Sequence, residues 1–570
     1  MAATLQSPIV PEMTERYQPW LATYRAEGIP ATIDPDAWAS VVHLLEDAMR
    51  AHGPRVAFRT RTRQLRYDEL ERDSAALCAW LQEVAHVRKG DRVALVMPNV
   101  LAFPVATLAI LRAGAVQVNV NPLYTARELE HQLVDAQVDV AIVHDDAAAA
   151  LAAGLARTRI HTLLVAGRGD APAPAAPGRF GQVKAFDFDQ AVRVGAGMAR
   201  RPVALSGADP LFLQYTGGTT GVSKGAVLSH RNLLANIEQF KAMNIGALHP
   251  GAETIVTAIP LYHIFALTVN FLAYASLGAE NWLVDDARDT AALIDVLRAA
   301  RPTVFVGVNT LYASLLRHPR LAEADFSRLA LSIGGGAAVL RTVSDGWRSA
   351  TGTFIREGYG LTEASPIVTF NPLSRRDFSG ATGLPLPGTD VRLLDQDGRD
   401  VAPGASGEVC IKGPQVMAGY WRQPQASAEA FTADGYLKTG DIGIVDPDGQ
   451  LRIVERKKDL VIVSGFNVYP TEVEAVASTL AGVAECACVG VPDARSGEAL
   501  ALFVVVAPGY TLDEQQVVAH CRAALTPYKV PRIVRLVATL PKSGVGKILR
   551  RALQQSFTEQ QTGTPCKETP

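Results

Sequence analysis

The stretch Tyr215-Thr-Gly-Gly-Thr-Thr-Gly-Val-Ser-Lys-Gly225 carries more information about this protein than any other part of its sequence. It follows residues 211–215 (LFLQY), an apolar run typical of a buried β-strand, and it combines four glycines with three threonines, a serine and a lysine. Glycines let the backbone approach an anion closely, while hydroxyls, amides and Lys224 attract phosphate oxygens. The stretch therefore predicts a phosphate-binding loop at the end of a strand rather than an ordinary surface loop.

Two other chemistries match fragments of this loop. A Walker A loop needs Gly-Lys followed by Ser or Thr, whereas Gly225 follows Lys224 here, and Ile548 follows the second candidate, Lys547. The loop also satisfies the G-x-S-x-G pattern of serine hydrolases around Ser223. In those enzymes the serine stands on a sharp turn directly after its strand, but here five Gly and Thr residues separate the strand from the pattern. A serine hydrolase using Ser223 stays as the alternative from another reaction class.

Length and composition set the broad class. A chain of 570 residues is too long for one hydrophobic core, so two or more domains are expected. Hydrophobic residues make up 48% and charged residues 20%, and the net charge of −2 gives no electrostatic reason to expect nucleic acid as a partner. The six cysteines form no zinc pattern and suit a reducing cytoplasm, and residues 1–20 do not resemble a signal peptide.

One segment has to be weighed as a membrane span. Residues 261–278 (LYHIFALTVNFLAYASLG) hold no charged side chain across 18 positions, about the lower limit for a transmembrane helix. His263 and Asn270 lie within the segment, and Pro260 precedes it. We therefore expect a buried helix of a large α/β domain.

Short apolar runs alternate with helical patterns over the first three quarters of the chain. The strand-like runs include residues 92–97, 138–143, 211–215 and 303–307, with helical segments such as 67–82 and 291–300 between them. That alternation predicts an α/β fold of parallel sheets covered by helices. Near Arg456 the pattern changes to a small α+β unit, with helices starting near 470 and 512 and strands around 486–491 and 502–506.

Further motifs accompany the glycine-rich loop in a fixed order. They are Pro260-Leu-Tyr-His-Ile-Phe265, Gly358-Tyr-Gly-Leu-Thr-Glu363, Tyr436-Leu-Lys-Thr-Gly-Asp441, Glu455-Arg-Lys-Lys-Asp459 and Pro541-Lys-Ser-Gly-Val-Gly-Lys547. Together they resemble the adenylate-forming superfamily of acyl-CoA synthetases, peptide-synthetase adenylation domains and firefly luciferase. Stretches such as Val463-Ser-Gly-Phe-Asn-Val-Tyr-Pro470 are similar to bacterial long-chain fatty-acid–CoA ligases, and the likeness covers about residues 33–553.

The resemblance implies a domain plan and a reaction. Residues 1–456 would form an N-terminal adenylation domain that binds ATP and the acyl group. Residues 457–556 would form a small, mobile C-terminal domain with a catalytic lysine, and residues 557–570 a disordered tail. A fatty acid would be joined to AMP with loss of pyrophosphate and then transferred to coenzyme A. Because one anion attacks another, the site must neutralise the carboxylate, the α-phosphate and the departing pyrophosphate.

The resemblance assigns the phosphates of ATP to the glycine-rich loop and to a glutamate. The loop residues that would cradle the β- and γ-phosphates are Thr216, Gly217, Gly218, Thr219, Thr220, Gly221 and Lys224. Glu363 would hold Mg²⁺, a hard cation that favours carboxylate oxygen, and Thr362 would touch the α-phosphate.

The nucleoside is assigned to three other motifs. Tyr359 would stack on adenine, surrounded by Gly335, Gly336, Ala337, Glu357, Gly358 and Gly360. Asp441 would accept hydrogen bonds from the ribose hydroxyls, and Arg456 would reach the ribose or a phosphate from the domain junction.

Four residues are assigned to the transfer steps. Lys547 would hold the carboxylate and the α-phosphate at attacking distance, in a loop made pliable by its glycines. His263 would act as a gate between adenylate and thiol. Lys458 would mark the hinge, and Gly465 would lie beside the pantetheine channel, where a side chain would obstruct coenzyme A.

Each of these residues also has an ordinary structural interpretation. Asp441 could be a turn residue, Arg456 part of a solvated charge run, Lys547 part of an exposed basic tail, and His263 a satisfied core histidine. Lys438 stands where long-chain enzymes usually have a histidine, which leaves the preferred acid open. The alternatives are a medium-chain or aryl acid as substrate, or a carrier protein as acceptor. Peripheral contact with the inner face of a membrane and a homodimer also stay open.

Overall fold

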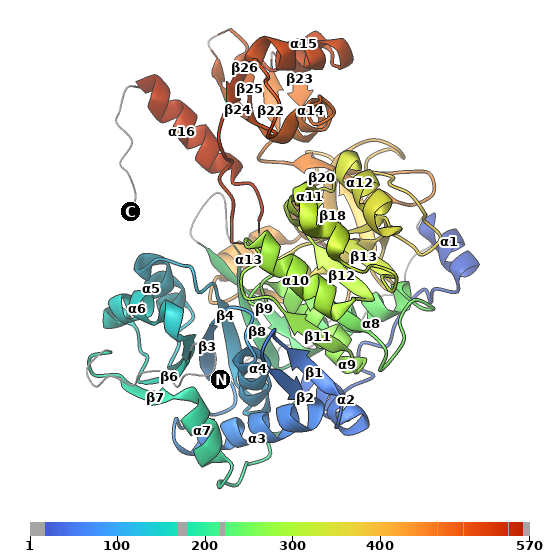
Figure 1. Cartoon of the computed structure of the whole chain (residues 1–570). Helices are drawn as coiled ribbons and strands as arrows, with labels where there is room; N and C mark the ends of the chain where they lie inside the picture. The colour runs from blue at the N-terminus through green and yellow to red at the C-terminus, as the bar shows by residue number, and fades with distance from the viewer. Residues whose placement is uncertain are drawn as a thin grey trace.

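The computed structural model describes residues 18–167, 180–216, 223–463, 466–493, 495–544 and 546–562. Within these residues the chain forms a large α/β domain and a smaller C-terminal domain, drawn in orange and red above it (Figure 1). The predicted α/β fold class is therefore confirmed.

An eight-stranded sheet has the order β19-β9-β8-β4-β3-β5-β6-β7. Its parallel strands are β3 (Arg92–Val96), β4 (Val116–Val120), β5 (Val140–His144), β6 (Thr162–Ala166), β7 (Lys184–Asp187) and β8 (Pro210–Thr216). Two strands, β9 (Lys224–Ser229) and β19 (Gly419–Tyr420), join it in antiparallel pairing. The strands predicted at 92–97, 138–143 and 211–215 are confirmed as β3, β5 and β8.

A nine-stranded sheet has the order β16-β15-β14-β13-β12-β10-β11-β1-β2. Its parallel strands are β1 (Val56–Arg59), β10 (Thr254–Thr257), β11 (Glu280–Leu283), β12 (Val304–Gly307), β13 (Leu331–Gly334) and β14 (Ile355–Gly360). The strands β2 (Gln64–Arg66), β15 (Ile367–Phe370) and β16 (Leu384–Pro385) pair antiparallel at its edges.

Helices separate and cover these two sheets. One apolar core joins strands of both sheets to α2 (Val41–His52), α3 (Tyr67–Glu83), α4 (Ala102–Arg112), α7 (Phe188–Gly195) and α8 (His230–Met243). The outer face of the eight-stranded sheet carries α5 (Ala126–Asp135) and α6 (Asp145–Gly154). The outer face of the nine-stranded sheet carries α10 (Thr290–Ala300), α11 (Asn309–Arg317) and α12 (Arg341–Thr351). Helices α1 (Trp20–Glu27) and α13 (Pro424–Ala430) complete the large domain.

The uncharged segment at 261–278 folds as a helix inside this core. It is π-helical over Ala266–Ala273, where every residue is buried, and it continues into α9 (Tyr274–Ser276). The expectation of a buried helix is confirmed. Among the described residues, the structure contains no helix with the length and apolar character needed to cross a membrane.

A third sheet, which the alternating pattern did not predict, is antiparallel throughout. It has the order β17-β18-β20-β21 and is built from β17 (Asp390–Leu394), β18 (Gly407–Lys412), β20 (Leu437–Val445) and β21 (Leu451–Arg456). Its register sets Asp441 of β20 directly opposite Arg456 of β21. Two of the predicted site residues are therefore paired by strand register.

The C-terminal domain is a five-stranded sheet with helices on both faces. Its strands are β22 (Val461–Val463), β23 (Phe466–Val468), β24 (Val483–Asp493), β25 (Gly497–Val506) and β26 (Ile533–Leu536). One face packs on α14 (Pro470–Ala477) and α15 (Glu514–Ala524), the other on α16 (Arg550–Thr562). Helix α16 extends into the segment from 557 onward that we expected to form the tail. Between the sheet and α16 the chain descends to the large domain and returns (Figure 1).

Every cysteine in the described part of the chain is buried: Cys78, Cys410, Cys486, Cys488 and Cys521. Burial raises the pKa of each thiol, to about 11 for Cys78. Cys486 and Cys488, two positions apart in β24, are both free thiols.

Candidate active site

The predicted motifs meet at the carboxyl ends of parallel strands, where α/β proteins usually bind ligands. Thr216 ends β8, Gly334 ends β13 and Gly360 ends β14. Gly217, Gly218, Thr219, Thr220, Gly221 and Gly465 lie outside the described residues.

On one side of the site, Lys224 and Glu363 share a contact with Tyr420. Lys224 begins β9, and its Nζ lies 5.3 Å from the centre of the Tyr420 ring. The Tyr420 hydroxyl donates a hydrogen bond of 2.8 Å to Glu363 Oε1. Burial raises the pKa of Glu363, and the Tyr420 hydrogen bond opposes that rise. Thr362 precedes Glu363 in the short 3₁₀ turn η4 (Thr362–Ala364).

The donor set here fits a hard cation. Glu363 Oε1 accepts the Tyr420 hydrogen bond, while Oε2 has no hydrogen-bond partner among the described residues. A carboxylate with one oxygen held and one left over is the kind of ligand that Mg²⁺ takes alongside phosphate oxygens.

The glycines assigned to adenine form a crowded backbone junction. A Cβ on Gly335 would lie 3.0 Å from the ring of Phe265 and 3.5 Å from the carbonyl oxygen of Gly358. Gly336 has a φ of +76°, and Ala337, which follows it, is exposed. A Cβ on Gly360 would lie 2.2 Å from the carbonyl oxygen of Pro366, so only glycine fits there. The junction brings the ends of β13 and β14 together.

Glu357 holds the loop that follows Gly335 and Gly336 at this junction. Its buried carboxylate accepts a 2.8 Å hydrogen bond from the Val339 backbone N–H, which follows the Gly334–Ala337 run. Burial raises the pKa of Glu357 to about 7. Its contact is with the loop, so any effect on the nucleotide would pass through the loop backbone.

Asp441 is held from two sides. The Tyr359 hydroxyl donates to Asp441 Oδ2 at 2.6 Å, and Arg456 Nε lies 2.9 Å from Oδ1. Asp441 is only 2% exposed, whereas Arg456 is 38% exposed. The interpretation of Asp441 as an isolated turn residue is excluded, because Asp441 is a buried residue of β20 that is held by Tyr359 of β14 and Arg456 of β21.

Lys547 lies on a tight hairpin of the C-terminal domain. Ser543 N–H donates to Lys547 O at 2.8 Å, and Gly546 N–H donates to Ser543 O at 2.8 Å. The Thr310 hydroxyl of the large domain donates to Gly546 O at 2.9 Å. A Cβ on Gly544 would lie 2.8 Å from the Tyr262 hydroxyl. We expected these glycines to make the loop pliable. In the structure they also allow the hairpin to approach Tyr262 and Thr310 of the large domain closely.

The electrostatics of Lys547 show what surrounds its ammonium. Loss of bulk water and the charges of Arg456, Lys458 and Arg550 together lower the pKa of Lys547 to about 8, against the opposing effect of Asp441. The pKa of Lys458 is lowered for the same reasons, first by burial and then by the charge of Arg456. Lys547 therefore does not belong to a free tail, because its hairpin contacts Thr310 of the large domain and its charge interacts with those of Asp441 and Arg456.

His263 lies within electrostatic reach of Lys547. Burial and the Lys547 charge lower the pKa of His263 to about 4, so the imidazole is neutral at pH 7. Its Nδ1 accepts a 3.3 Å hydrogen bond from the Phe265 N–H. Since Nδ1 accepts, the proton of the neutral ring is on Nε2.

Two residues that make contacts at the site were not predicted from the sequence. One is Tyr420, whose only sequence signal is its place in Gly419-Tyr-Trp421. The other is Arg550, which contacts Glu455 at 2.9 Å and Glu474 at 2.8 Å. In sequence Arg550 belongs to the run Lys547-Ile-Leu-Arg-Arg551, which looks like a solvated basic tail.

Ser223 does not sit on a nucleophile elbow. It stands between β8 and β9, in a strand–loop–strand unit rather than a strand–turn–helix unit. Its hydroxyl donates to the backbone oxygen of Thr216 at 2.6 Å. The geometry does not support the serine hydrolase alternative.

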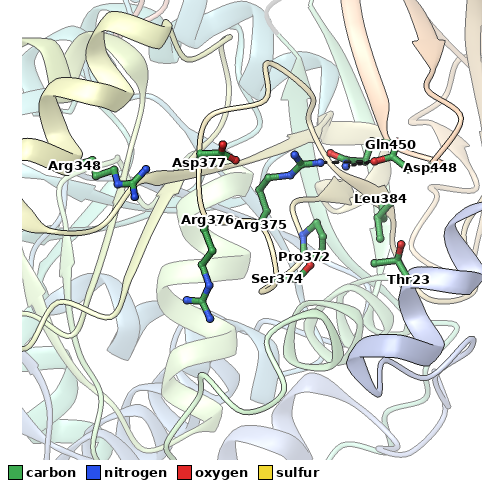
Figure 2. Close-up of a pocket in the computed structure, with 10 residues that line it drawn as sticks. All are labelled: Thr23, Arg348, Pro372, Ser374, Arg375, Arg376, Asp377, Leu384, Asp448 and Gln450. Carbon is green, nitrogen blue, oxygen red and sulfur yellow. Dashed lines mark hydrogen bonds and ion pairs between the residues drawn. The ribbon is translucent and has the colours of Figure 1, made fainter.

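A separate pocket of about 400 Å³ lies between α1, α12 and the loop at 372–377. Figure 2 shows its three arginines, Arg348, Arg375 and Arg376, pointing in different directions. Arg375 pairs with Asp448 at 3.7 Å. None of the residues that line the pocket was predicted as a site residue, so it is distinct from the site above.

Comparison with known proteins agrees with the geometry. The AMP-binding enzyme family matches residues 45–421, and the AMP-binding enzyme C-terminal domain matches residues 472–547. A long-chain-fatty-acid–CoA ligase of Salmonella typhimurium is 46% identical over 550 residues, which cover 94% of this chain and 97% of that protein. The crystal structure of ATP-bound MatB from Rhodopseudomonas palustris is similar, with a TM-score of 0.80 and 30% identity, over 91% of this chain and 99% of that one. The anthranilate CoA ligase AuaEII in complex with anthranoyl-AMP shares the fold, with a TM-score of 0.84 and 24% identity, over 93% and 100% of the two chains. The chain belongs to the family of AMP-binding enzymes, the adenylate-forming superfamily that its motifs resemble.

Proposed function

We propose that this enzyme ligates a long-chain fatty acid to coenzyme A through an acyl-adenylate, using ATP and releasing pyrophosphate and AMP. The observation that carries the proposal is the docking of the Lys547 hairpin, where Thr310 of the large domain donates to Gly546 O at 2.9 Å. This docking brings the Lys547 ammonium within electrostatic reach of Asp441 and Arg456. The long-chain-fatty-acid–CoA ligase relative, similar over nearly its whole length, supports the same reaction.

In the first step, a carboxylate oxygen of the fatty acid forms a bond to the α-phosphorus of ATP, and the bond from that phosphorus to the bridging oxygen of pyrophosphate breaks. Asp441 accepts from the ribose hydroxyls, and Tyr359 packs against adenine while its hydroxyl orients Asp441. The Lys547 ammonium contacts both the fatty-acid carboxylate and the α-phosphate, so it draws two anions together. Thr216, Lys224 and Thr362 hold the phosphate chain.

Glu363 is the residue that would hold Mg²⁺. When bound, Mg²⁺ neutralises phosphate charge and helps pyrophosphate depart. The contribution of the chain itself is to keep Glu363 fixed by Tyr420 and open on one oxygen.

In the second step, the thiol sulfur of coenzyme A bonds to the acyl carbon, and the bond from that carbon to the AMP oxygen breaks. We propose that the Lys547 hairpin withdraws first, since it occupies the space beside Tyr262 and Thr310. Movement about Lys458, between domains 1–456 and 457–556, would bring Gly465 toward pantetheine. The neutral His263 imidazole, within electrostatic reach of Lys547, would act as the gate between adenylate and thiol.

The remaining parts of the proposal concern the fatty acid, the location of the enzyme and its oligomeric state. Because the reaction uses ATP and coenzyme A, we propose that it takes place in the cytoplasm. Its fatty-acid substrates would derive from membranes, and we therefore also propose peripheral contact with the inner membrane face. A homodimer is compatible with this proposal. A medium-chain or aryl acid, or a carrier-protein acceptor, is the competing assignment.

The experiment is to measure AMP and pyrophosphate release with purified protein, Mg²⁺ and ATP, using acids from acetate to oleate, with and without coenzyme A. AMP release that needs coenzyme A and is greatest with long chains is the expected result. Pyrophosphate release without turnover on coenzyme A would favour a carrier-protein acceptor. Absence of acid-dependent release would overturn the proposal, and labelling of Ser223 by an active-site phosphonate probe would support the serine hydrolase alternative instead.

A further inference from the structure

One side chain, Tyr420, bridges the two charged residues of the phosphate side. Its hydroxyl donates to Glu363 Oε1 at 2.8 Å, and its ring centre lies 5.3 Å from Lys224 Nζ. The three residues come from three separate elements: β9, η4 and β19. Tyr420 therefore contacts both the lysine and the glutamate and links their positions.

Backbone contacts fix Tyr420 against both partners. β19 pairs with β9, with Tyr420 opposite Ala226, and Trp421 N–H donates to Gly225 O at 2.8 Å. On the other side, Met417 N–H donates to the Glu363 backbone oxygen at 2.8 Å. The segment 417–421 is thus hydrogen-bonded both to the strand of Lys224 and to the turn of Glu363.

The ring also keeps the two charges apart. Among the described residues, Lys224 makes no ion pair. Its ammonium contacts the ring of Tyr420, while Glu363 accepts a hydrogen bond from the hydroxyl of the same tyrosine. An aromatic face attracts an ammonium group through its quadrupole, but it leaves the ammonium free to turn to an anion. A direct Lys224–Glu363 ion pair would have to break before a metal-bound polyphosphate could enter.

We propose that Tyr420 is a positioning residue that couples the metal carboxylate Glu363 to the phosphate lysine Lys224, so that the enzyme binds ATP and Mg²⁺ together. This inference rests on the proposed function. The hydroxyl sets the direction of the Glu363 carboxylate, and the ring seats the Lys224 ammonium, so the two parts of one side chain serve two different ligand groups.

Two substitutions separate these parts. Tyr420→Phe keeps the ring and removes the hydrogen bond, so ATP binding in the presence of Mg²⁺ should weaken about tenfold, the size of a lost hydrogen bond to a charged group. ATP binding in EDTA should change less than about twofold, because the aromatic ring that contacts the Lys224 ammonium is still present. Tyr420→Leu removes both parts and should weaken ATP binding in EDTA as well, about threefold. Calorimetric titration of ATP, with and without Mg²⁺, measures the binding of both variants.

The chain offers a matched control. Tyr436 is a buried tyrosine whose hydroxyl donates to Asp390 and whose ring faces Arg392 at 5.1 Å and Lys412 at 5.5 Å. It repeats the combination of ring, carboxylate and cation away from the strand ends of the site. Tyr436→Phe should leave ATP binding unchanged under both conditions.

A second readout separates positioning from general damage. Thioester formation from preformed acyl-AMP and coenzyme A needs no ATP, so Tyr420→Phe should retain the wild-type rate in that half-reaction. Equal loss in both half-reactions, or Mg²⁺-dependent ATP binding within twofold of wild type, would overturn the role of Tyr420. If the wild-type protein itself binds no ATP or forms no adenylate, the proposed function fails instead.

Discussion

Arg550, at the start of α16, lies 2.9 Å from Glu455 of β21, across 95 positions of sequence. The same guanidinium contacts Glu474 of α14 at 2.8 Å and Asp459 at 3.5 Å. One largely buried cation therefore ties the large domain to the small one, three residues after Lys547.

Replacing Arg550 with alanine leaves Glu455 and Glu474 in low-exposure sites without their cation. Such a loss typically destabilises a protein by about 3–5 kcal/mol. We expect that destabilisation in chemical unfolding, together with a larger loss of adenylation than of thioester formation, because the hairpin loses its anchor. Arg532→Ala is the control: Arg532 forms an exposed pair with Asp493 at 3.0 Å, which should contribute about 0–1 kcal/mol. Equal effects of the two variants would contradict the anchor role of Arg550.

Lys547→Ala should lower the rate of acyl-adenylate formation about 10²- to 10³-fold, the usual effect of removing one well-placed electrostatic group. Thioester formation from preformed acyl-AMP should be retained. Acid-dependent pyrophosphate release measures the first step and acyl-CoA formation the second. Lys542→Ala, in the same hairpin but paired with Glu485 at 2.8 Å, is the control. Normal adenylation by Lys547→Ala would refute the assignment.

The first step should have an alkaline limit set by Lys547. Its pKa is lowered to about 8, so the ammonium is charged below that pH and neutral above it. Because the charged form draws the two anions together, kcat/KM for adenylation should fall as pH rises through about 8. Lys547→Arg should move this limit to higher pH, since a guanidinium stays charged. A limit that stays in place in that variant would assign it to another group.

Gly544→Ala should oppose docking of the hairpin. The added Cβ would lie 2.8 Å from the Tyr262 hydroxyl, and overpacking of this kind costs about 1–3 kcal/mol. Adenylation should fall by the corresponding factor, about 5- to 150-fold. The double variant with Tyr262→Phe should recover part of the rate. Gly197→Ala, where the nearest atom is Val194 O at 3.6 Å, should have no effect. A double variant no better than Gly544→Ala would place the steric conflict elsewhere.

The sequence was sufficient where structure is local. Phosphate binding by residues 215–225 stays a prediction that rests on glycine, hydroxyl and lysine within one loop, whereas the strand before the loop, expected from its apolar run, is confirmed as β8. The buried helix around Ala266–Ala273 followed from the absence of charge, but its π-helical form did not, because it depends on packing inside the core.

Other contacts could not be predicted because they depend on register and long-range pairing. Tyr420 meets Lys224 only because β19 adds to the edge of β9, nearly 200 positions away in sequence. Glu357 was expected at the nucleotide, yet its side chain holds the Val339 backbone. The antiparallel sheet that pairs Asp441 with Arg456 has short strands and turns that do not show the alternating α/β pattern.

The burial of the cysteines matters for an enzyme that makes activated acyl groups. Acyl-adenylates and thioesters readily acylate a thiolate, and a thiol becomes a nucleophile only when it is deprotonated. In the described chain, each cysteine is shielded from solvent and has a raised pKa, so the thiol of coenzyme A meets no competing protein thiol there. The same feature leaves that part of the protein without an accessible thiol. A cysteine introduced on the Lys547 hairpin, with Cys566 outside the described residues replaced, would therefore report the movement of the hairpin.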